Sequence, residues 1–178
     1  LVVCPGLVDL SVRLREPGLE YKATLESEMA AAVAGGVTSF ACPPDTDPPL
    51  DEPSLVEMLK HRARNLNQAH VYTVGALTQG LKGERLTEMA ELFDAGCVVF
   101  GQPDGLLSNL RILMQAMHYA STFDFSVWLR PQEISLTHHG VAHDGEVATR
   151  LGLPTIPMCS ETIAISNIIL LMKETGVK

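Results

Sequence analysis

The sequence predicts an α/β fold in which about five βα units contribute to a parallel sheet. Short β-branched or apolar runs alternate along the chain with stretches of helical periodicity, which is typical of βα units. One of these runs, residues 97–100, is apolar throughout, as a strand buried on both faces is. With 178 residues and 46% apolar content, the chain is also long enough to bury a core.

The individual elements follow from local signals. The apolar runs predict strands at residues 6–14, 37–42, 70–76, 97–100 and 125–129. The stretches between and after them predict helices over 24–34, from 54, over 86–95, from 108 and over 161–173. The first helix has an acidic first turn and ends at Gly35-Gly36. Residues 54–57 have the form of a capping box, and Ser108 can cap the next-to-last helix. The last helix follows a polar loop with His138, His139 and His143.

Composition and charge exclude several classes of partner. A formal net charge of −8 leaves no basic stripe to meet phosphates along a duplex, so we expect no nucleic-acid partner. No apolar run reaches the ~18 residues that a membrane-spanning helix needs, so we expect no membrane association. The cysteines are widely spaced, without a C-x-x-C pair or a secretory leader, which predicts reduced thiols in a cytoplasmic protein.

One segment carries a specific family signature. Residues 5–18 read PGLVDLSVRLREPG. This run resembles the first-strand signature of the dihydroorotases, P-G-L-I-D-x-H-x-H-L-R-E-P-G. Further similarities to that family lie at residues 35–38, 44–48, 75–78, 140–146 and 150–154, so the resemblance covers essentially the whole chain.

The resemblance implies a (β/α)8 TIM barrel of the amidohydrolase type. Such a barrel takes eight strands, and about five βα units do not close one. An open doubly wound sheet is the alternative on pattern alone, but no G-x-G-x-x-G run supports it. The chain begins in mid-strand and ends after a helix. We therefore expect residues 1–178 to form a partial amidohydrolase-like barrel domain of a longer protein.

The same resemblance points to a loss at the positions that bind metal ions in the family. A hydrolytic site holds its divalent cation with neutral imidazoles and carboxylates, and an H-x-H pair presents both rings on one strand face. Here these positions are Ser11 and Arg13. Farther along, Gln102 stands for an aspartate ligand, Arg130 for a histidine ligand, and Gln79 lies near a lysine that some relatives carboxylate. Because serine and glutamine are poor ligands and arginine is a permanent cation, we expect no metal cofactor.

The substrate side of the family's site is partly kept. Arg15 matches the arginine that binds the substrate carboxylate, where a planar guanidinium can pair through two hydrogen bonds. Asp47 replaces an asparagine that assists it, and a carboxylate there repels an anionic substrate. We therefore expect Arg15 and Asp47 to form a vestigial substrate site. The alternative for Arg15 is an ion pair with Glu16 or Asp47.

Other catalytic sites have weaker support. His138, His139 and His143 could in principle bind zinc, but adjacent histidines rarely point the same way and their spacing matches no common ligand pattern, so a solvated loop is favoured. There is no G-x-S-x-G run, and Ser11 has no base near it in the sequence.

The first functional hypothesis is therefore a dihydroorotase-like pseudoenzyme of pyrimidine biosynthesis. The resemblance to the bacterial pseudo-dihydroorotases implies association with aspartate carbamoyltransferase catalytic chains in a homo- or hetero-oligomer. The second hypothesis is an active cyclic amidohydrolase that interconverts N-carbamoyl-L-aspartate and dihydroorotate, or a related cyclic amide, at a rearranged zinc site. A third is a metal-free sensor that binds an anion through Arg15.

Overall fold

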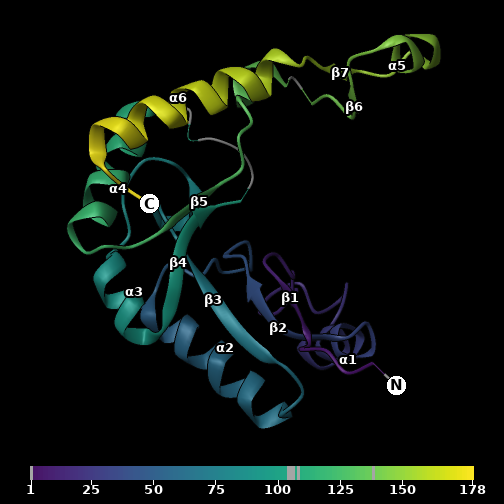
Figure 1. Ribbon diagram of the computed structural model, residues 1–178, viewed down its shortest axis with the longest axis vertical. Helices are drawn as coiled ribbons and strands as arrows, with labels where there is room; N and C mark the ends of the chain where they lie inside the picture. The colour runs from purple at the N-terminus through teal and green to yellow at the C-terminus, as the bar shows by residue number, and fades with distance from the viewer. Residues whose placement is uncertain (1, 104–106, 108, 138) are drawn as a thin grey trace. The chain divides into compact units, whose positions relative to one another are not determined.

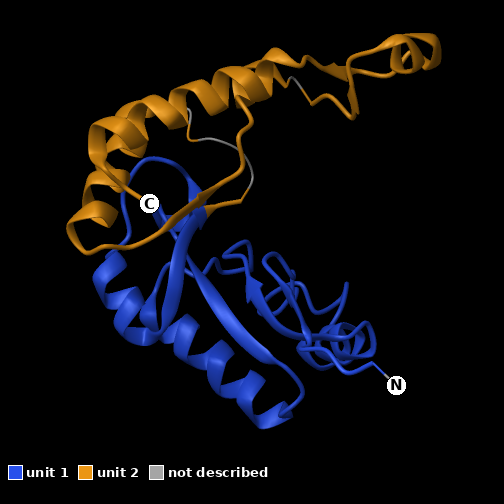
Figure 2. Ribbon diagram, in the orientation of Figure 1, with its two compact units in different colours: residues 1–101 blue, residues 102–178 orange. Residues whose placement is uncertain are grey.

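The computed structural model describes residues 2–103, 107, 109–137 and 139–178. The chain divides into two compact units, Leu1–Gly101 (unit 1) and Gln102–Lys178 (unit 2), which Figure 2 shows in different colours. The sequence predicts one partial domain over the whole chain, and each unit is described by itself below.

Unit 1 is built of parallel strands joined by helices, as the alternating pattern predicts (Figure 1). Its strands are β1 (Leu7–Asp9), β2 (Val37–Cys42), β3 (His70–Ala76) and β4 (Cys97–Gln102), the last of which ends on the first residue of unit 2. They follow one another in the sheet in chain order, and β1–β2, β2–β3 and β3–β4 are all parallel pairs. The connections contain α1 (Leu25–Ala34), α2 (Pro53–Leu66), the short 3₁₀ helix η1 (Gln79–Leu81) and α3 (Met89–Ala95).

Local signals explain where these helices begin and end. Thr24 caps α1 by accepting from the backbone N–H of Ser27, whose hydroxyl accepts from the N–H of Thr24 in return. Gly96 ends α3 in the left-handed region at φ 111, as a glycine does at low cost. The capping box predicted at residues 54–57 is wrong, because α2 begins at Pro53 and its N-cap residue Glu52 makes no capping hydrogen bond. Proline fits the first turn of a helix, where its missing N–H has no partner to lose.

The core of unit 1 lies between its sheet and its helices. Ala41, Val74 and Val99, from three neighbouring strands, form a buried cluster. Further large side chains on strands and helices are fully buried, among them Met29, Phe40, Leu59, Leu92 and Phe100. Cys42 and Cys97 also lie in this core, and their burial raises the pKa of the Cys42 thiol to about 12 and that of the Cys97 thiol to about 11.

Unit 2 packs two long helices against each other. These are α4 (Leu110–Thr122) and α6 (Cys159–Thr175), and β5 (Val127–Leu129) follows α4 in the chain. Leu113, Ala116, Met117 and Ala120 of α4 are buried, whereas Leu110 is exposed. Asn109 caps α4 by accepting from the N–H groups of Arg111 and Ile112. The predicted cap Ser108 lies outside the described residues.

The segment between β5 and α6 has more structure than the predicted polar loop. It contains the 3₁₀ helix η2 (Ile134–Leu136), the parallel strands β6 (Ala142–His143) and β7 (Thr155–Ile156), and α5 (Glu146–Leu151) between those strands. This small βαβ unit was missed because two-residue strands carry no readable periodicity. In the described residues of both units, no helix is long and apolar enough to cross a membrane.

Candidate functional site

Arg13 stands where the family motif has a metal-binding histidine. It lies just beyond the carboxyl end of β1 and forms an ion pair. Its Nε donates to Oδ2 of Asp45 at 2.5 Å, and Asp45 in turn lies just beyond the carboxyl end of β2. The two side chains are 35% and 15% exposed. Beside them the N–H of Val12 donates to the carbonyl of Ala41 at 2.9 Å, which keeps the two segments in register. The guanidinium of Arg13, paired with the carboxylate of Asp45, therefore stands where the family motif has a metal-binding histidine.

Ser11 and Arg13 both lie beyond the end of the strand on which they were predicted. The first strand was expected to continue to residue 14, but β1 ends at Asp9. The N–H of Ser11 donates to Oδ1 of Asp9 at 2.9 Å, which is a turn contact, and the residue is exposed. Ser11 therefore lies in an exposed turn that follows the strand.

The two other replaced ligand positions lie in unit 2. Gln102 is the last residue of β4 and is 7% exposed. Arg130 follows β5 directly and is exposed. Gln79, which the resemblance places near a carboxylated lysine, follows β3 in η1 of unit 1 and is exposed. Each position thus lies at or just after the carboxyl end of a strand, which is where barrel enzymes carry their functional residues.

The side chains at these positions do not fit a divalent metal ion. A hydroxyl, two guanidinium groups and two amides offer no imidazole and no carboxylate, and Arg13 would repel a cation. The carboxylate of Asp45 is engaged by Arg13. In the part of the chain that the structure describes, no group of three or more His, Cys, Asp or Glu side chains is placed to hold a metal. In the histidine loop, His139 and His143 are exposed and His138 lies outside the described residues.

Arg15, the predicted anion-binding residue, is half-buried and has a left-handed backbone at φ 61. No ion pair or side-chain hydrogen bond joins its guanidinium to another residue within the described ranges. The alternative expectation, an ion pair with Glu16 or Asp47, is therefore wrong. The buried Glu16 pairs instead with Arg62 of α2 and accepts from the N–H of Leu25 at 2.8 Å.

Asp47, the predicted companion of Arg15, lies in a loop that is held against the Arg15 loop. The N–H of Asp47 donates to the carbonyl of Pro17 at 3.0 Å. Gly18, at φ +90, lies so close to Asp47 that a Cβ there would overlap the Asp47 carbonyl. The Asp47 side chain is exposed. The structure therefore brings the two loops of the predicted substrate site together through their backbones.

Sequence reasoning missed two residues that shape this region, Asp45 and Arg62, and it assigned Glu16 to Arg15 and not to Arg62. A signal for Asp45 was present: an acid occurs in the run 44–48, where the dihydroorotase motif P-N-T-N-P has an amide, while a cation occurs at Arg13. Paired changes of opposite charge are a hint of contact. No comparable signal linked Glu16 to Arg62, which lie on separate elements.

Comparison with known proteins decides the family. A family model described as dihydro-orotase-like matches residues 1–178. The chain belongs to the dihydroorotase-like family. It is 48% identical over 178 residues to a dihydroorotase-like protein of Pseudomonas putida, and 41% identical over 177 residues to a dihydroorotase of Syntrophotalea carbinolica. These alignments cover 100% and 99% of this chain but only 42% of each relative. The dihydroorotase-like chain therefore spans less than half of the proteins that it matches.

Solved structures show the fold of this dihydroorotase-like chain. An L-hydantoinase (dihydropyrimidinase) from Arthrobacter aurescens aligns with a TM-score of 0.73 at 20% identity, over 97% of this chain and 40% of that one. A dihydroorotase from Saccharomyces cerevisiae, solved with 5-fluoroorotic acid, aligns with a TM-score of 0.62 at 15% identity, over 98% of this chain and 46% of that one. The predicted partial amidohydrolase-type TIM barrel is confirmed.

Proposed function

We propose that the protein is a catalytically inactive dihydroorotase-like pseudoenzyme that serves as a structural partner of aspartate carbamoyltransferase catalytic chains in cytoplasmic pyrimidine biosynthesis. The observation that carries the proposal is the Arg13–Asp45 ion pair at a family ligand position. A guanidinium keeps its positive charge at every physiological pH, so it disfavours a metal ion there under all conditions of growth.

The other replaced positions support the same conclusion. Gln102 and Arg130 offer an amide and a second guanidinium where the family resemblance calls for an aspartate and a histidine. Since several ligands share the affinity of a metal site, restoring the family residues at only one or two of these positions would not restore binding. We expect the double variant Ser11→His/Arg13→His to remain without stoichiometric zinc for this reason.

The partnership rests on the family resemblance and on the family membership of the chain. A protein of this family that has lost its metal ligands but kept its fold can still contribute a surface to an assembly. The signature residues at 5–9 and 14–18, which shape the first strand and its turn, are kept while the ligands are lost. This pattern is what selection for structure without selection for catalysis leaves behind.

Two measurements on the full-length protein test the proposal. Metal content after incubation with zinc, combined with cyclisation of N-carbamoyl-L-aspartate, tests inactivity, with the Syntrophotalea carbinolica dihydroorotase as the positive control. Stoichiometric zinc together with cyclisation would overturn the proposal in favour of an active cyclic amidohydrolase with a rearranged site. Size-exclusion chromatography and mass spectrometry of a mixture with aspartate carbamoyltransferase catalytic chains test the partnership, and two separate species would overturn it.

A further inference from the structure

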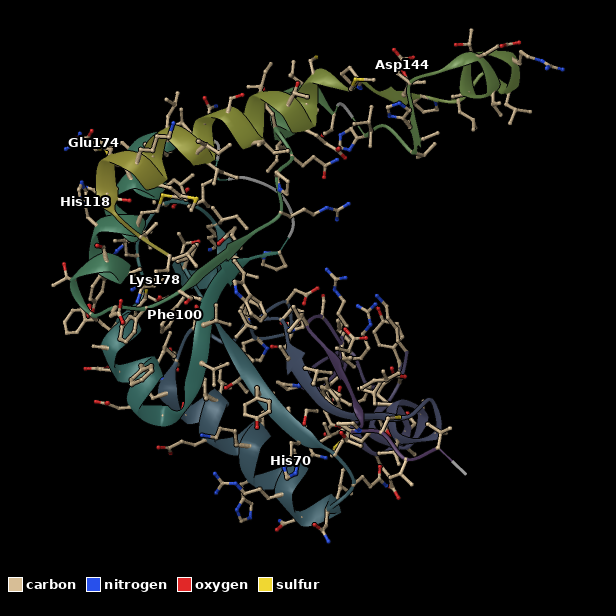
Figure 3. The ribbon with its side chains drawn as sticks, viewed as in Figure 1. His70, Phe100, His118, Asp144, Glu174 and Lys178 are labelled. Atoms are coloured by element: carbon tan, nitrogen blue, oxygen red, sulfur yellow. The ribbon has the colours of Figure 1, made fainter. Side chains whose placement is uncertain are left out.

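A cavity of about 640 Å³ lies in unit 1 at the amino ends of strands β3 and β4, whereas Arg13 lies beyond a carboxyl end. It is bordered by the last turns of α2 and by the first residues of β3 and β4. Figure 3 shows His70, the first residue of β3, beside α2. The volume falls within the range of small-molecule sites in proteins.

The ionisable side chains of this cavity are basic. They are Lys60, Arg64 and His70, and none of the described residues that line the cavity carries a carboxylate. Three neutral side chains with hydrogen-bond donors also line the cavity: Asn67, Gln68 and Tyr72. A concentration of cations is unusual in a chain whose formal net charge is −8. An anionic ligand would therefore find here the local positive potential that the protein as a whole does not offer.

Neighbouring groups do not cancel this charge. Lys60 and Arg64 also border a second hollow that includes Glu57 and Asp94, but neither carboxylate forms an ion pair with them within the described residues. The carboxyl ends of α2 and α3 lie at the cavity, and each helix end carries roughly half a negative charge. The two ends together offset about one of the two permanent cations, so a net positive charge remains.

The cations are held in different ways. Nζ of Lys60 donates to the carbonyl of Ala95, the last residue of α3, at 3.0 Å. Gly96 makes room for this ammonium group, because a Cβ at that position would overlap Nζ. Arg64 is exposed, and its guanidinium has no ion-pair partner among the described residues. Lys60 is thus a fixed point charge, while the two-pronged donor of Arg64 is available to a ligand.

We propose that this cavity binds a small phosphorylated molecule, with its phosphate oxygens on Arg64, Lys60 and His70. A phosphate group offers three acceptor oxygens and nearly two negative charges, which suits a cavity lined by several basic side chains of α2 and β3 better than a carboxylate does. The half-exposed ring of Tyr72 and the amides of Asn67 and Gln68 border the remaining space, which is larger than phosphate alone requires. This proposal is independent of the one for the Arg13 site.

Calorimetric titration of the full-length protein with inorganic pyrophosphate at low ionic strength tests the proposal. We expect binding of one equivalent and a loss of at least about tenfold in affinity in Arg64→Gln, since a hydrogen-bonded charge is removed. The matched control is Arg85→Gln, which removes the same charge from an exposed position of unit 1 outside the cavity. Equal weakening by both variants would show a diffuse charge effect and overturn the proposal, as would absence of binding.

Three further measurements separate the site from its alternatives. Citrate at the same concentration should bind at least about tenfold more weakly than pyrophosphate, and equal binding would refute a phosphate site. Hydrogen exchange should slow in residues 60–72 on addition of pyrophosphate, and unchanged exchange there with slowing elsewhere would place the ligand at another site. If Arg64→Gln lowers the melting temperature, Arg64→Lys serves instead, because it keeps the positive charge but loses the paired donors of the guanidinium. Unchanged affinity in Arg64→Lys would contradict the assigned contact.

Discussion

The Arg13–Asp45 ion pair should contribute measurably to the stability of unit 1. At an effective dielectric constant near 20, charges about 4 Å apart attract by about 4 kcal/mol, before desolvation and side-chain ordering reduce the net value. Exposed pairs retain 0.2–1 kcal/mol, whereas breaking a buried pair costs about 3–5 kcal/mol. With side chains 35% and 15% exposed, this pair lies between these cases. We expect Arg13→Gln or Asp45→Asn to lower the free energy of unfolding by about 1.5 kcal/mol.

A double-mutant cycle on the full-length protein measures this contribution. Urea unfolding of Arg13→Gln, Asp45→Asn and the double variant should give a coupling energy near 1 kcal/mol, and a melting temperature roughly 3–6 °C lower in each single variant. Sodium chloride at about 1 M should reduce the coupling, because both side chains retain contact with solvent. Additive effects within about 0.3 kcal/mol would show that the two charges do not interact, and would remove the main support for an ion pair in place of a metal ligand.

Three further predictions concern other residues. Arg62→Ala should lower the free energy of unfolding by about 2 kcal/mol, because the buried Glu16 loses its cation, and Arg62→Lys should recover part of that loss in the same urea titration. Alkylation at pH 8, mapped by mass spectrometry, should leave Cys42 and Cys97 unmodified in the folded protein, because their raised pKa values keep them as thiols; rapid labelling would contradict their burial. N-carbamoyl-L-aspartate at millimolar concentration should raise the melting temperature if Arg15 binds anions, and Arg15→Gln should abolish the shift; no shift in the parent protein would refute this role.

Much of unit 1 could be predicted because its strands are strongly patterned. The strands at residues 37–42 and 70–76 were predicted with the bounds that β2 and β3 have, since both are apolar, rich in β-branched residues and bounded by turn residues or helices. The first strand was predicted too long, because apolar residues continue past Asp9 into a turn. The start of α2 was misplaced because Pro53, and not a side-chain cap, sets it.

The sequence predicted less of the candidate site than of the strands. A motif match located Ser11, Arg13, Gln102 and Arg130 and stated which functional groups replace the family's ligands. It did not reveal the Arg13–Asp45 contact, because these residues lie 32 positions apart and only the pairing of β1 with β2 brings them together. A sequence pattern gives the chemistry at each position, whereas the partner of each charge depends on the register of the sheet.

The position of Glu16 limits how the loop after β1 can move. Its carboxylate holds the N–H of Leu25 at the start of α1 and the guanidinium of Arg62 in the middle of α2, and its neighbour in the chain is Arg15. A displacement of this loop must therefore either break a buried charge contact or carry both helices along. The loop, α1 and α2 should therefore move together as one rigid element. Slow hydrogen exchange of the Leu25 amide would show that this contact stays closed.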